Sequence, residues 1–137
     1  MVLIDANVFM YSAGAPHPNK EPSTAFLDKA ARGEIDAAVD AEVLQEILHR
    51  YRAIGRWLQG RHVYDSTRRI IPVVIPITEQ VTDSARYLMD VHENLSARDA
   101  LHAAVYHSEA AGSWCSFDRD FDLVPGLVRK EPGSYLS

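Results

Sequence analysis

Short apolar runs alternate with amphipathic segments along this chain. The apolar runs predict strands at residues 2–4, 35–39, 73–75, 114–117 and 127–129. Apolar residues at helical spacing predict helices at residues 23–32, 41–54, 56–70, 78–92 and 96–111. Strands that alternate with helices in this way are typical of parallel strands joined by right-handed crossovers. The sequence therefore predicts an α/β fold with a central parallel sheet of four to five strands.

The first predicted strand ends abruptly on polar residues. Asp5 and Asn7 follow it directly, and the apolar pattern resumes at Val8. In open parallel sheets ligands bind beyond the carboxyl ends of the strands, so Asp5 would lie at a binding position. Asp5 or Asn7 could instead cap the helix that follows, because both residue types are good N-caps. The positions of the other acidic residues are needed to distinguish between these two roles.

Several further acids are predicted to lie at the same edge of the sheet. They follow the second strand, begin the helix after Ser96 or follow the fourth strand: Asp40, Glu42, Glu46, Asp99, Asp118, Asp120 and Asp122. Carboxylates that point into one crevice repel each other unless they hold a cation, and oxygen ligands favour hard metals such as Mg²⁺ or Mn²⁺. The sequence thus predicts a metal site.

Each of these acids also has a local explanation. Asp99 stands three residues after Ser96, as the acid of a capping box does. Asp118 could form an Asx turn after its strand. Glu42 and Glu46 lie four residues apart on one side of a helix, and their spacing leaves the choice between them open.

The histidines show no metal-binding spacing. His102 and His107 lie five residues apart on one predicted helix and lack the HExxH arrangement of zinc enzymes. No cysteine stands at zinc-ligand spacing from them, and the chain has a single cysteine, Cys115. We expect these histidines to be structural or surface residues.

Length and composition indicate one globular domain. The chain has 137 residues, of which 47% are hydrophobic and 24% charged. We expect a single domain over residues 1–131, followed by a C-terminal tail over 132–137. No apolar stretch approaches the length of a membrane span, and no basic segment precedes an apolar one as in a signal peptide. With one cysteine and no internal disulfide, the expected location is the cytoplasm.

The net charge of −5 does not exclude a nucleic-acid partner. Phosphate binding ordinarily requires positive charge. Clustered acids that hold a divalent cation would lower the formal charge while leaving the bound metal to meet phosphate.

Four short motifs resemble those of the PIN-domain ribonucleases, and their order and spacing are similar to the VapC-type toxins of toxin–antitoxin pairs. They are Leu-Ile-Asp5-Ala-Asn7-Val, Glu-Val-Leu-Gln-Glu46-Ile, Ser-Ala-Arg-Asp99-Ala-Leu-His-Ala-Ala and Ser-Phe-Asp118-Arg-Asp-Phe. The resemblance covers nearly the whole chain. It implies a PIN-like three-layer α/β/α fold.

The resemblance also implies the site residues. The metal-binding acids of the family correspond to Asp5, Glu46, Asp99 and Asp118, which selects Glu46 over Glu42 as the ligand and leaves Glu42 a supporting position. Polar positions that support the site correspond to Asn7, Ser116 and Asp120. Ala6 and Ser116 replace threonines that are often seen in the family, which puts the hydrogen bonds behind the ligands in doubt.

The implied activity is that of a metal-dependent endoribonuclease. Mg²⁺ or Mn²⁺ held by the four acids would activate water for attack on an RNA phosphodiester. Arg98 and Arg119, beside two of the acids, are placed to contact RNA phosphates. The resemblance further implies a small antitoxin as partner and a homodimer. The helices around Tyr51 and Trp57 could supply apolar residues to the antitoxin, or these two residues could belong to the core.

Three other functions would share some of these sequence features. A haloacid dehalogenase-like phosphatase also begins with a strand that ends in Asp, but it requires a second Asp where this chain has Asn7. A receiver-like signalling module would lack its lysine after a late strand. A non-catalytic PIN-like module remains an alternative, although all four acids are present.

Overall fold

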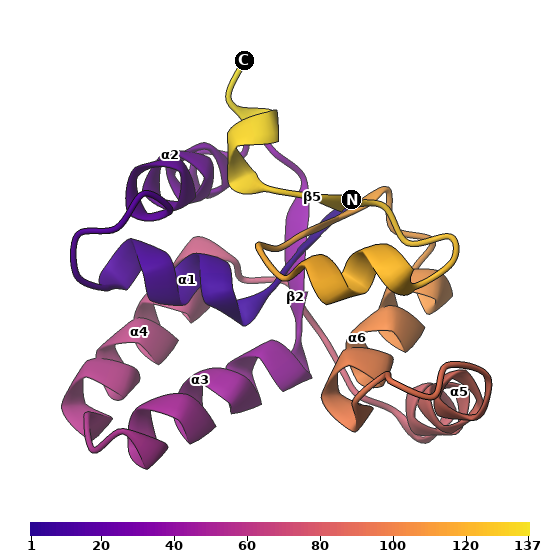
Figure 1. Cartoon of the computed structure of the whole chain (residues 1–137). Coiled ribbons are helices and arrows are strands. Elements are labelled where there is room, and N and C mark those ends of the chain that lie inside the picture. The colour runs from indigo at the N-terminus through magenta and orange to yellow at the C-terminus, as the bar shows by residue number, and fades with distance from the viewer.

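Five short parallel strands form the centre of the computed structural model, which describes residues 1–137. They are β1 (Val2–Ile4), β2 (Ala37–Asp40), β3 (Val74–Ile75), β4 (Ser113–Cys115) and β5 (Arg129–Lys130). The strand order is β3-β2-β1-β4-β5, and Figure 1 shows the sheet nearly edge-on. In the register, Leu3 of β1 lies beside Ala38 of β2 and Trp114 of β4. The carboxyl ends of the three central strands therefore meet at one edge.

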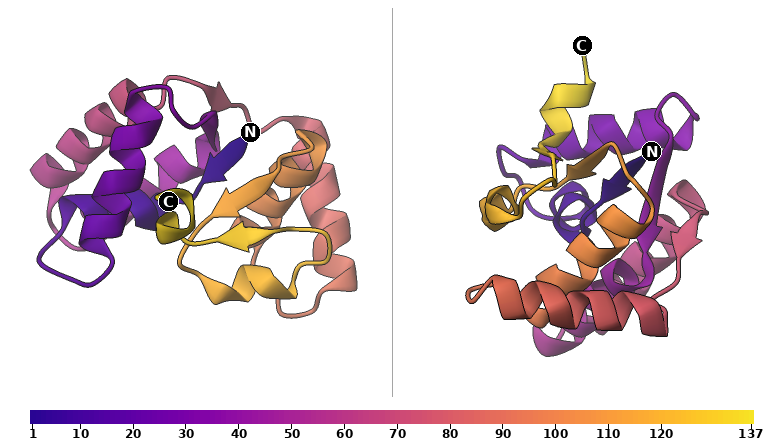
Figure 2. Two further views of the ribbon diagram at one scale, coloured as in Figure 1. Left: turned by 90° about the horizontal axis from the view of Figure 1, so that it is seen from above. Right: turned by 90° about the vertical axis from the view of Figure 1, so that its right-hand side faces the viewer.

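Helices cover both faces of this sheet and make three layers. On one side lie α1 (Ala6–Ala13), α2 (Lys20–Ala31), α3 (Ala41–Ala53) and α4 (Trp57–Ile70). On the other side lie α5 (Glu79–Val91) and α6 (Ala97–Ser108), which pack against each other (Figures 1 and 2). The predicted α/β/α arrangement with a central parallel sheet is confirmed.

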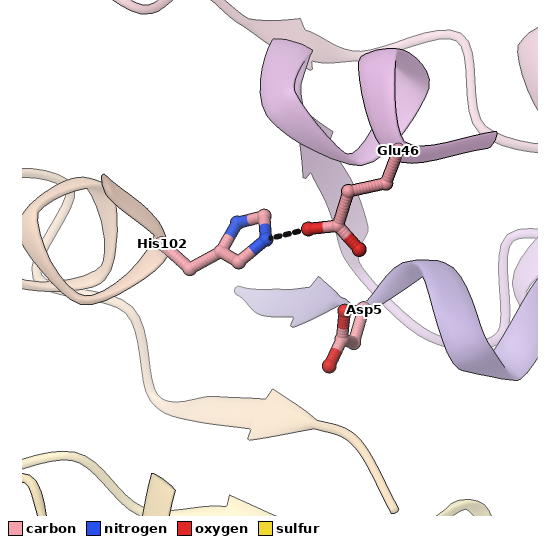
Figure 3. Close-up of side chains that lie close together, drawn as sticks. All are labelled: Asp5, Glu46 and His102. Carbon is pink, nitrogen blue, oxygen red and sulfur yellow. Dashed lines mark hydrogen bonds and ion pairs between the residues drawn. The ribbon is translucent and has the colours of Figure 1, made fainter. Parts of the chain in front are cut away.

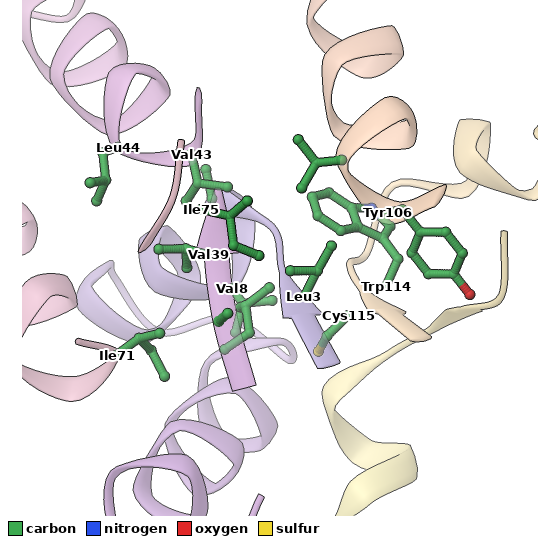
Figure 4. Packing of buried hydrophobic residues seen from close by; sticks show 14 of the residues in the cluster. Leu3, Val8, Val39, Val43, Leu44, Ile71, Ile75, Tyr106, Trp114 and Cys115 are labelled. Carbon is green, nitrogen blue, oxygen red and sulfur yellow. The ribbon is translucent and has the colours of Figure 1, made fainter. Parts of the chain in front are cut away.

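The central strands are apolar because helices bury both of their faces. Leu3, Val39 and Trp114 are fully buried. Figure 4 shows them in a core that also includes Val8 of α1 and Tyr106 of α6, one from each covering layer. Burial of a side chain of this size stabilises the fold by roughly 1.5 to 3 kcal/mol. The alternation of short apolar runs with helices is thus the direct cause of the layered architecture.

Capping residues set the starts of four helices. Asp5, Asp40, Thr78 and Ser96 are the N-caps of α1, α3, α5 and α6, and each accepts a hydrogen bond from a backbone N–H of its helix. Each cap satisfies a donor that would otherwise lack a partner. Gly55, at a φ of 72°, separates α3 from α4 in a backbone conformation that favours glycine.

Several element boundaries differ from the sequence prediction. Helix α2 begins three residues earlier than predicted, and α6 ends three residues earlier, at Ser108. Strand β4 covers Ser113–Cys115, so Ser116 and Phe117 lie beyond its end. Strand β5 begins at Arg129, because its pairing with Trp114 and Cys115 of β4 decides its position. The displacements lie at element ends, where hydrogen-bond partners from elsewhere in the chain decide the boundary.

The last residues form a short 3-10 helix, η2 (Pro132–Tyr135), within the segment that we expected to be a tail. Tyr135 donates to or accepts from Ser113 through its hydroxyl and stacks edge-on against Phe26 of α2. Burial raises the pKa of the Tyr135 phenol to about 12. The segment therefore packs on the domain. None of the helices combines the length and apolar character needed to cross a bilayer.

Candidate active site

One cavity at the carboxyl edge of the sheet collects the four predicted acids. It has a volume of about 360 Å³, and its polar lining includes Asp5, Asn7, Glu46, His49, Arg50, Arg98, Asp99 and Asp118. Asp5 follows β1, Glu46 lies on α3, Asp99 on α6, and Asp118 lies beyond β4. Residues more than a hundred positions apart in the sequence thus face one space because parallel strands end at one edge.

Asp5 is almost fully buried, with 5% of its surface exposed. One oxygen accepts from the backbone N–H of Ala6 at 2.7 Å, and the other accepts from the Ser116 hydroxyl at 2.6 Å. The pKa of the Asp5 carboxyl is raised to about 6, mainly by burial and in part by the charge of Glu46, while His102 and the hydrogen bonds from Ser116 and Ala6 limit the rise. Asp5 is therefore both the cap of α1 and a wall of the cavity. The two roles considered for it are compatible.

Ser116 connects two of the candidate ligands. Besides donating to Asp5, its oxygen accepts from the Asn7 amide at 3.2 Å and from the backbone N–H of Asp118 at 3.0 Å. The Asn7 amide nitrogen also lies 3.3 Å from Asp5 Oδ2. Serine at this position thus makes the supporting hydrogen bonds that the absence of a threonine had put in doubt.

The structure places Glu46, rather than Glu42, at the cavity. Glu46 Oε1 lies 3.4 Å from Arg98 Nε and 2.5 Å from His102 Nε2, and its side chain is 12% exposed. Glu42 lies one turn earlier on α3, outside the cavity lining. Burial raises the pKa of the Glu42 carboxyl, and nearby Glu46 and Asp40 raise it further.

His102 is the main residue near the site that the sequence analysis did not single out, because we expected the histidines to be structural or surface residues. Its ring is 1% exposed and lies between two carboxylates, with Nδ1 2.7 Å from Asp40 and Nε2 2.5 Å from Glu46. Burial alone would lower the pKa of His102, but the hydrogen bonds to these carboxylates outweigh it and raise the pKa well above its usual value. A usable signal existed, because His102 follows Asp99 by three residues and therefore shares its face of the helix.

Asp118 forms its expected local turn as well as facing the cavity, whereas at Asp99 only the Ser96 half of the capping box is formed. The backbone N–H of Asp99 donates to the Ser96 side chain at 3.1 Å, and that of Asp120 donates to Asp118 at 3.0 Å, as in an Asx turn. Burial raises the pKa of the Asp99 carboxyl, and the charge of Asp118 raises it further. Burial, and not repulsion between like charges, is thus the larger cause of the shifts at Asp5 and Asp99.

The acids form two adjoining groups whose chemistry fits a hard divalent cation. Candidate ligand atoms of Asp5, Glu46 and His102 lie within 4.8 Å of one another, and those of Asp99, Asp118 and Asp120 do the same (Figure 3 shows the first group). Carboxylate oxygens dominate both groups, as Mg²⁺ and Mn²⁺ prefer. Asp120 is exposed and joins the second group from outside the cavity.

Two arginines also line the cavity. They are Arg98, which we expected to contact RNA, and Arg50 of α3, and His49 of α3 is a further part of the lining. Arg119 is exposed on the 3-10 helix η1 (Arg119–Leu123) and does not line the cavity. Tyr51 is buried in the core, while half-buried Trp57 lies under the guanidinium of Arg52 at 4.5 Å.

Comparison with known proteins identifies similar chains. Residues 2–127 match the family model described as PIN domain. The chain is 41% identical over 129 residues to ribonuclease VapC13 of Mycobacterium tuberculosis, covering 94% of this chain and 98% of that protein.

Solved structures show the same fold. The crystal structure of VapC20 of Mycobacterium tuberculosis, a toxin that cleaves the sarcin–ricin loop, has a TM-score of 0.73 at 16% identity and covers 93% of this chain and 97% of the other. A toxin–antitoxin complex from Klebsiella pneumoniae has a TM-score of 0.65 at 15% identity and covers 96% and 98%.

Proposed function

The chain belongs to the PIN-domain family, and on that basis we propose that it is a metal-dependent endoribonuclease that acts as the toxin of a toxin–antitoxin pair. The single observation that carries the proposal is the convergence of Asp5, Glu46, Asp99 and Asp118 on one cavity. A relative with 41% identity over almost its whole length is named a ribonuclease. Family membership favours this function over the phosphatase and receiver-like alternatives.

The four carboxylates are proposed to hold Mg²⁺ or Mn²⁺. When bound, such an ion activates water for in-line attack on a phosphodiester and stabilises the charge that gathers on the phosphate oxygens. Asp5 is held for this task by Ala6 and Ser116, so its orientation is already fixed before a ligand arrives. Asp118 is fixed through its backbone contact with the same Ser116 hydroxyl.

The positive side chains of the cavity are proposed to bind the RNA backbone. Arg50 and Arg98 line the same space as the acids, and both side chains are exposed enough to meet a polymer. Arginine suits phosphate because its planar fork donates two parallel hydrogen bonds. Arg98 also contacts Glu46, so it can neutralise part of the acidic charge that would otherwise repel RNA.

The proposed partners are an antitoxin and a second copy of the chain. One structure with the same fold is described as a toxin–antitoxin complex. A groove beside the cavity, lined by Met10, Tyr11, Arg50, Ile54 and Arg56 among others, offers apolar and basic side chains for such a partner. A nuclease of this kind would act on RNA in the cytoplasm, where its single thiol remains reduced.

Incubation with a mixed RNA pool tests the proposed activity. We expect cleavage with Mg²⁺ or Mn²⁺, none with EDTA, and none by Asp99→Asn. Asp65→Asn is the matched control, because Asp65 is exposed on α4 and away from the cavity. Cleavage that survives EDTA, or that Asp99→Asn retains at the wild-type rate, would overturn the proposal.

A further inference from the structure

We propose that His102, held by Asp40, is a positioning residue that orients the carboxyl group of Glu46 toward the metal site. This inference rests on the proposed function. It concerns a buried carboxylate–histidine–carboxylate chain that links helix α6 to helix α3.

Asp40 is the fixed end of this chain. It is fully buried and ends β2, and its Oδ1 accepts the backbone N–H of Val43 at 3.0 Å as the N-cap of α3. Its other oxygen, Oδ2, lies 2.7 Å from Nδ1 of His102. The orientation of the imidazole is therefore tied to the backbone at the start of α3.

The core prevents the ring from turning away. The His102 ring lies 4.9 Å from the Trp114 ring and 6.2 Å from the Phe121 ring, measured between centroids. Both aromatic residues are buried, and His102 itself is 1% exposed. A side chain locked by packing on its faces and by a hydrogen bond at one nitrogen presents its second nitrogen in a defined direction.

That second nitrogen, Nε2, meets Glu46 Oε1 at 2.5 Å (Figure 3). Arg98 contacts the same oxygen, so the hydrogen bond and the ion pair of Glu46 both fall on Oε1. Oε2 makes neither of these contacts, so it can bind a metal ion beside Asp5. Candidate ligand atoms of Asp5, Glu46 and His102 lie within 4.8 Å of one another.

The arrangement has a clear physical benefit for metal binding. A free glutamate side chain loses rotamer entropy when it is fixed. A neighbour that holds one oxygen removes part of this cost before the ion arrives. Groups that orient a metal ligand in this way typically alter metal affinity by about 10- to 100-fold when they are removed.

Two matched variants separate this role from a structural one. His102→Gln places an amide N–H near the position of ring Nε2 and keeps the contact with Glu46. His102→Asn places its amide near Nδ1 and keeps the contact with Asp40 only. Both variants lose the aromatic ring. His107→Asn on the exposed side of α6 is the control.

The measurement is Mn²⁺ binding to the full chain by isothermal titration calorimetry, with circular dichroism to verify folding. We expect His102→Asn to bind Mn²⁺ about 10- to 100-fold more weakly, whereas His102→Gln keeps most of the affinity and His107→Asn equals the wild type. If the His102 variants fail to fold, Asp40→Asn takes their place, because it keeps the capping oxygen for Val43 and still disturbs the ring; it should weaken Mn²⁺ binding in the same direction.

Each other outcome counts against the inference. Equal affinities for the Asn and Gln variants would mean that His102 only supports the fold. Tighter binding by both would mean that His102 only repels the ion. If the wild type binds Mn²⁺ and cleaves RNA but the His102 variants bind Mn²⁺ as tightly, the role of His102 is wrong and the proposed function stands. If the wild type binds no Mn²⁺, the proposed function is overturned as well.

Discussion

Ser116 donates its hydroxyl proton to Asp5 Oδ2 at 2.6 Å, although 111 positions separate the two residues. The Ser116 hydroxyl oxygen in turn accepts from the Asn7 amide and from the backbone N–H of Asp118. One buried hydroxyl thus joins the ends of β1 and β4, which carry two of the four candidate ligands. This contact forms only when the two strands pair in the observed register.

The Ser116 contact predicts a loss of both stability and activity in Ser116→Ala. The variant leaves buried Asp5 with one donor fewer, which should lower the free energy of unfolding by about 1 to 3 kcal/mol. Because the ligands lose their support, RNA cleavage should fall by about 10- to 100-fold. Ser116→Thr keeps the hydroxyl and should retain most activity in the same assay. Equal activity of the Ala and Thr variants would contradict the role of the hydroxyl.

Arg50 and Arg119 should differ in their contribution to RNA binding. Arg50 lines the cavity, whereas Arg119 is exposed outside it. In the inactive Asp99→Asn background, Arg50→Ala should weaken RNA binding and reduce the slope of log affinity against log salt by about 0.7, the loss of one phosphate contact. Arg119→Ala removes the same charge and should leave the slope unchanged. Fluorescence anisotropy over a salt series measures both, and a larger effect of Arg119 would contradict the placement of the RNA.

Neutralising Asp5 should stabilise the metal-free protein near neutral pH. The pKa of Asp5 is about 6 in the fold against 3.8 without it, so its carboxyl binds a proton more readily in the folded state. The stability that it contributes is complete below pH 4 and is lost as the pH rises through about 6. In EDTA, Asp5→Asn should therefore be more stable than the wild type by about 1 kcal/mol near pH 7.

Urea unfolding between pH 4 and 7 checks this pH dependence. The difference between Asp5→Asn and the wild type should shrink as the pH falls toward 4. Asp65→Asn, at an exposed position, should show a difference from the wild type that does not vary over this range. A destabilised Asp5→Asn at pH 7 would mean that losing the hydrogen bond accepted from Ser116 costs more than the removal of the buried charge gains.

Gly60 should tolerate no side chain, because α4 packs closely on α3 at this point. A Cβ on Gly60 would lie 2.4 Å from Tyr51 Cβ, a contact that requires the helices to separate. Gly60→Ala should lower stability by about 1 to 3 kcal/mol in thermal or urea unfolding. Gly133→Ala is the control, because no atom lies within 4 Å of the added Cβ. If Gly60→Ala is as stable as the wild type, the two helices can move apart at little cost.

The layered fold was predictable because its causes are local. Val2–Ile4 is apolar because helices cover both faces of β1, and Ser96 and Thr78 cap the helices that they precede. Family resemblance then selected Glu46 over Glu42, which helical spacing alone had left open. In the structure Glu46 lines the cavity and Glu42 does not, and the role of Glu46 as a metal ligand stays a prediction.

The hydrogen bonds behind the ligands were not predictable, because they join residues distant in sequence. His102 lies 62 positions from Asp40 and 56 from Glu46, and no spacing rule relates them. Arg129 was likewise undistinguished in the sequence. In the structure it pairs with Asp122 at 2.9 Å and donates to the carbonyl of Ser116, which fixes β5 beside the site. Such contacts depend on strand register, which the local pattern does not specify.

The thermal stability of the wild type and Asp99→Asn, with EDTA and with Mg²⁺, tests most directly whether the carboxylates form a metal site. Metal binding to the folded chain raises its stability by an amount set by the affinity. Asp99 also lies in the first turn of α6, where a negative charge favours the start of a helix, so a purely structural role is a definite alternative.

We predict that Mg²⁺ raises the melting temperature of the wild type and of the exposed control Asp65→Asn, but has little effect on Asp99→Asn. In EDTA, Asp99→Asn should be at least as stable as the wild type, because burial raises the pKa of the Asp99 carboxyl and makes its charge costly. A wild type insensitive to Mg²⁺, together with an Asp99→Asn variant destabilised equally in EDTA and in Mg²⁺, would contradict the account.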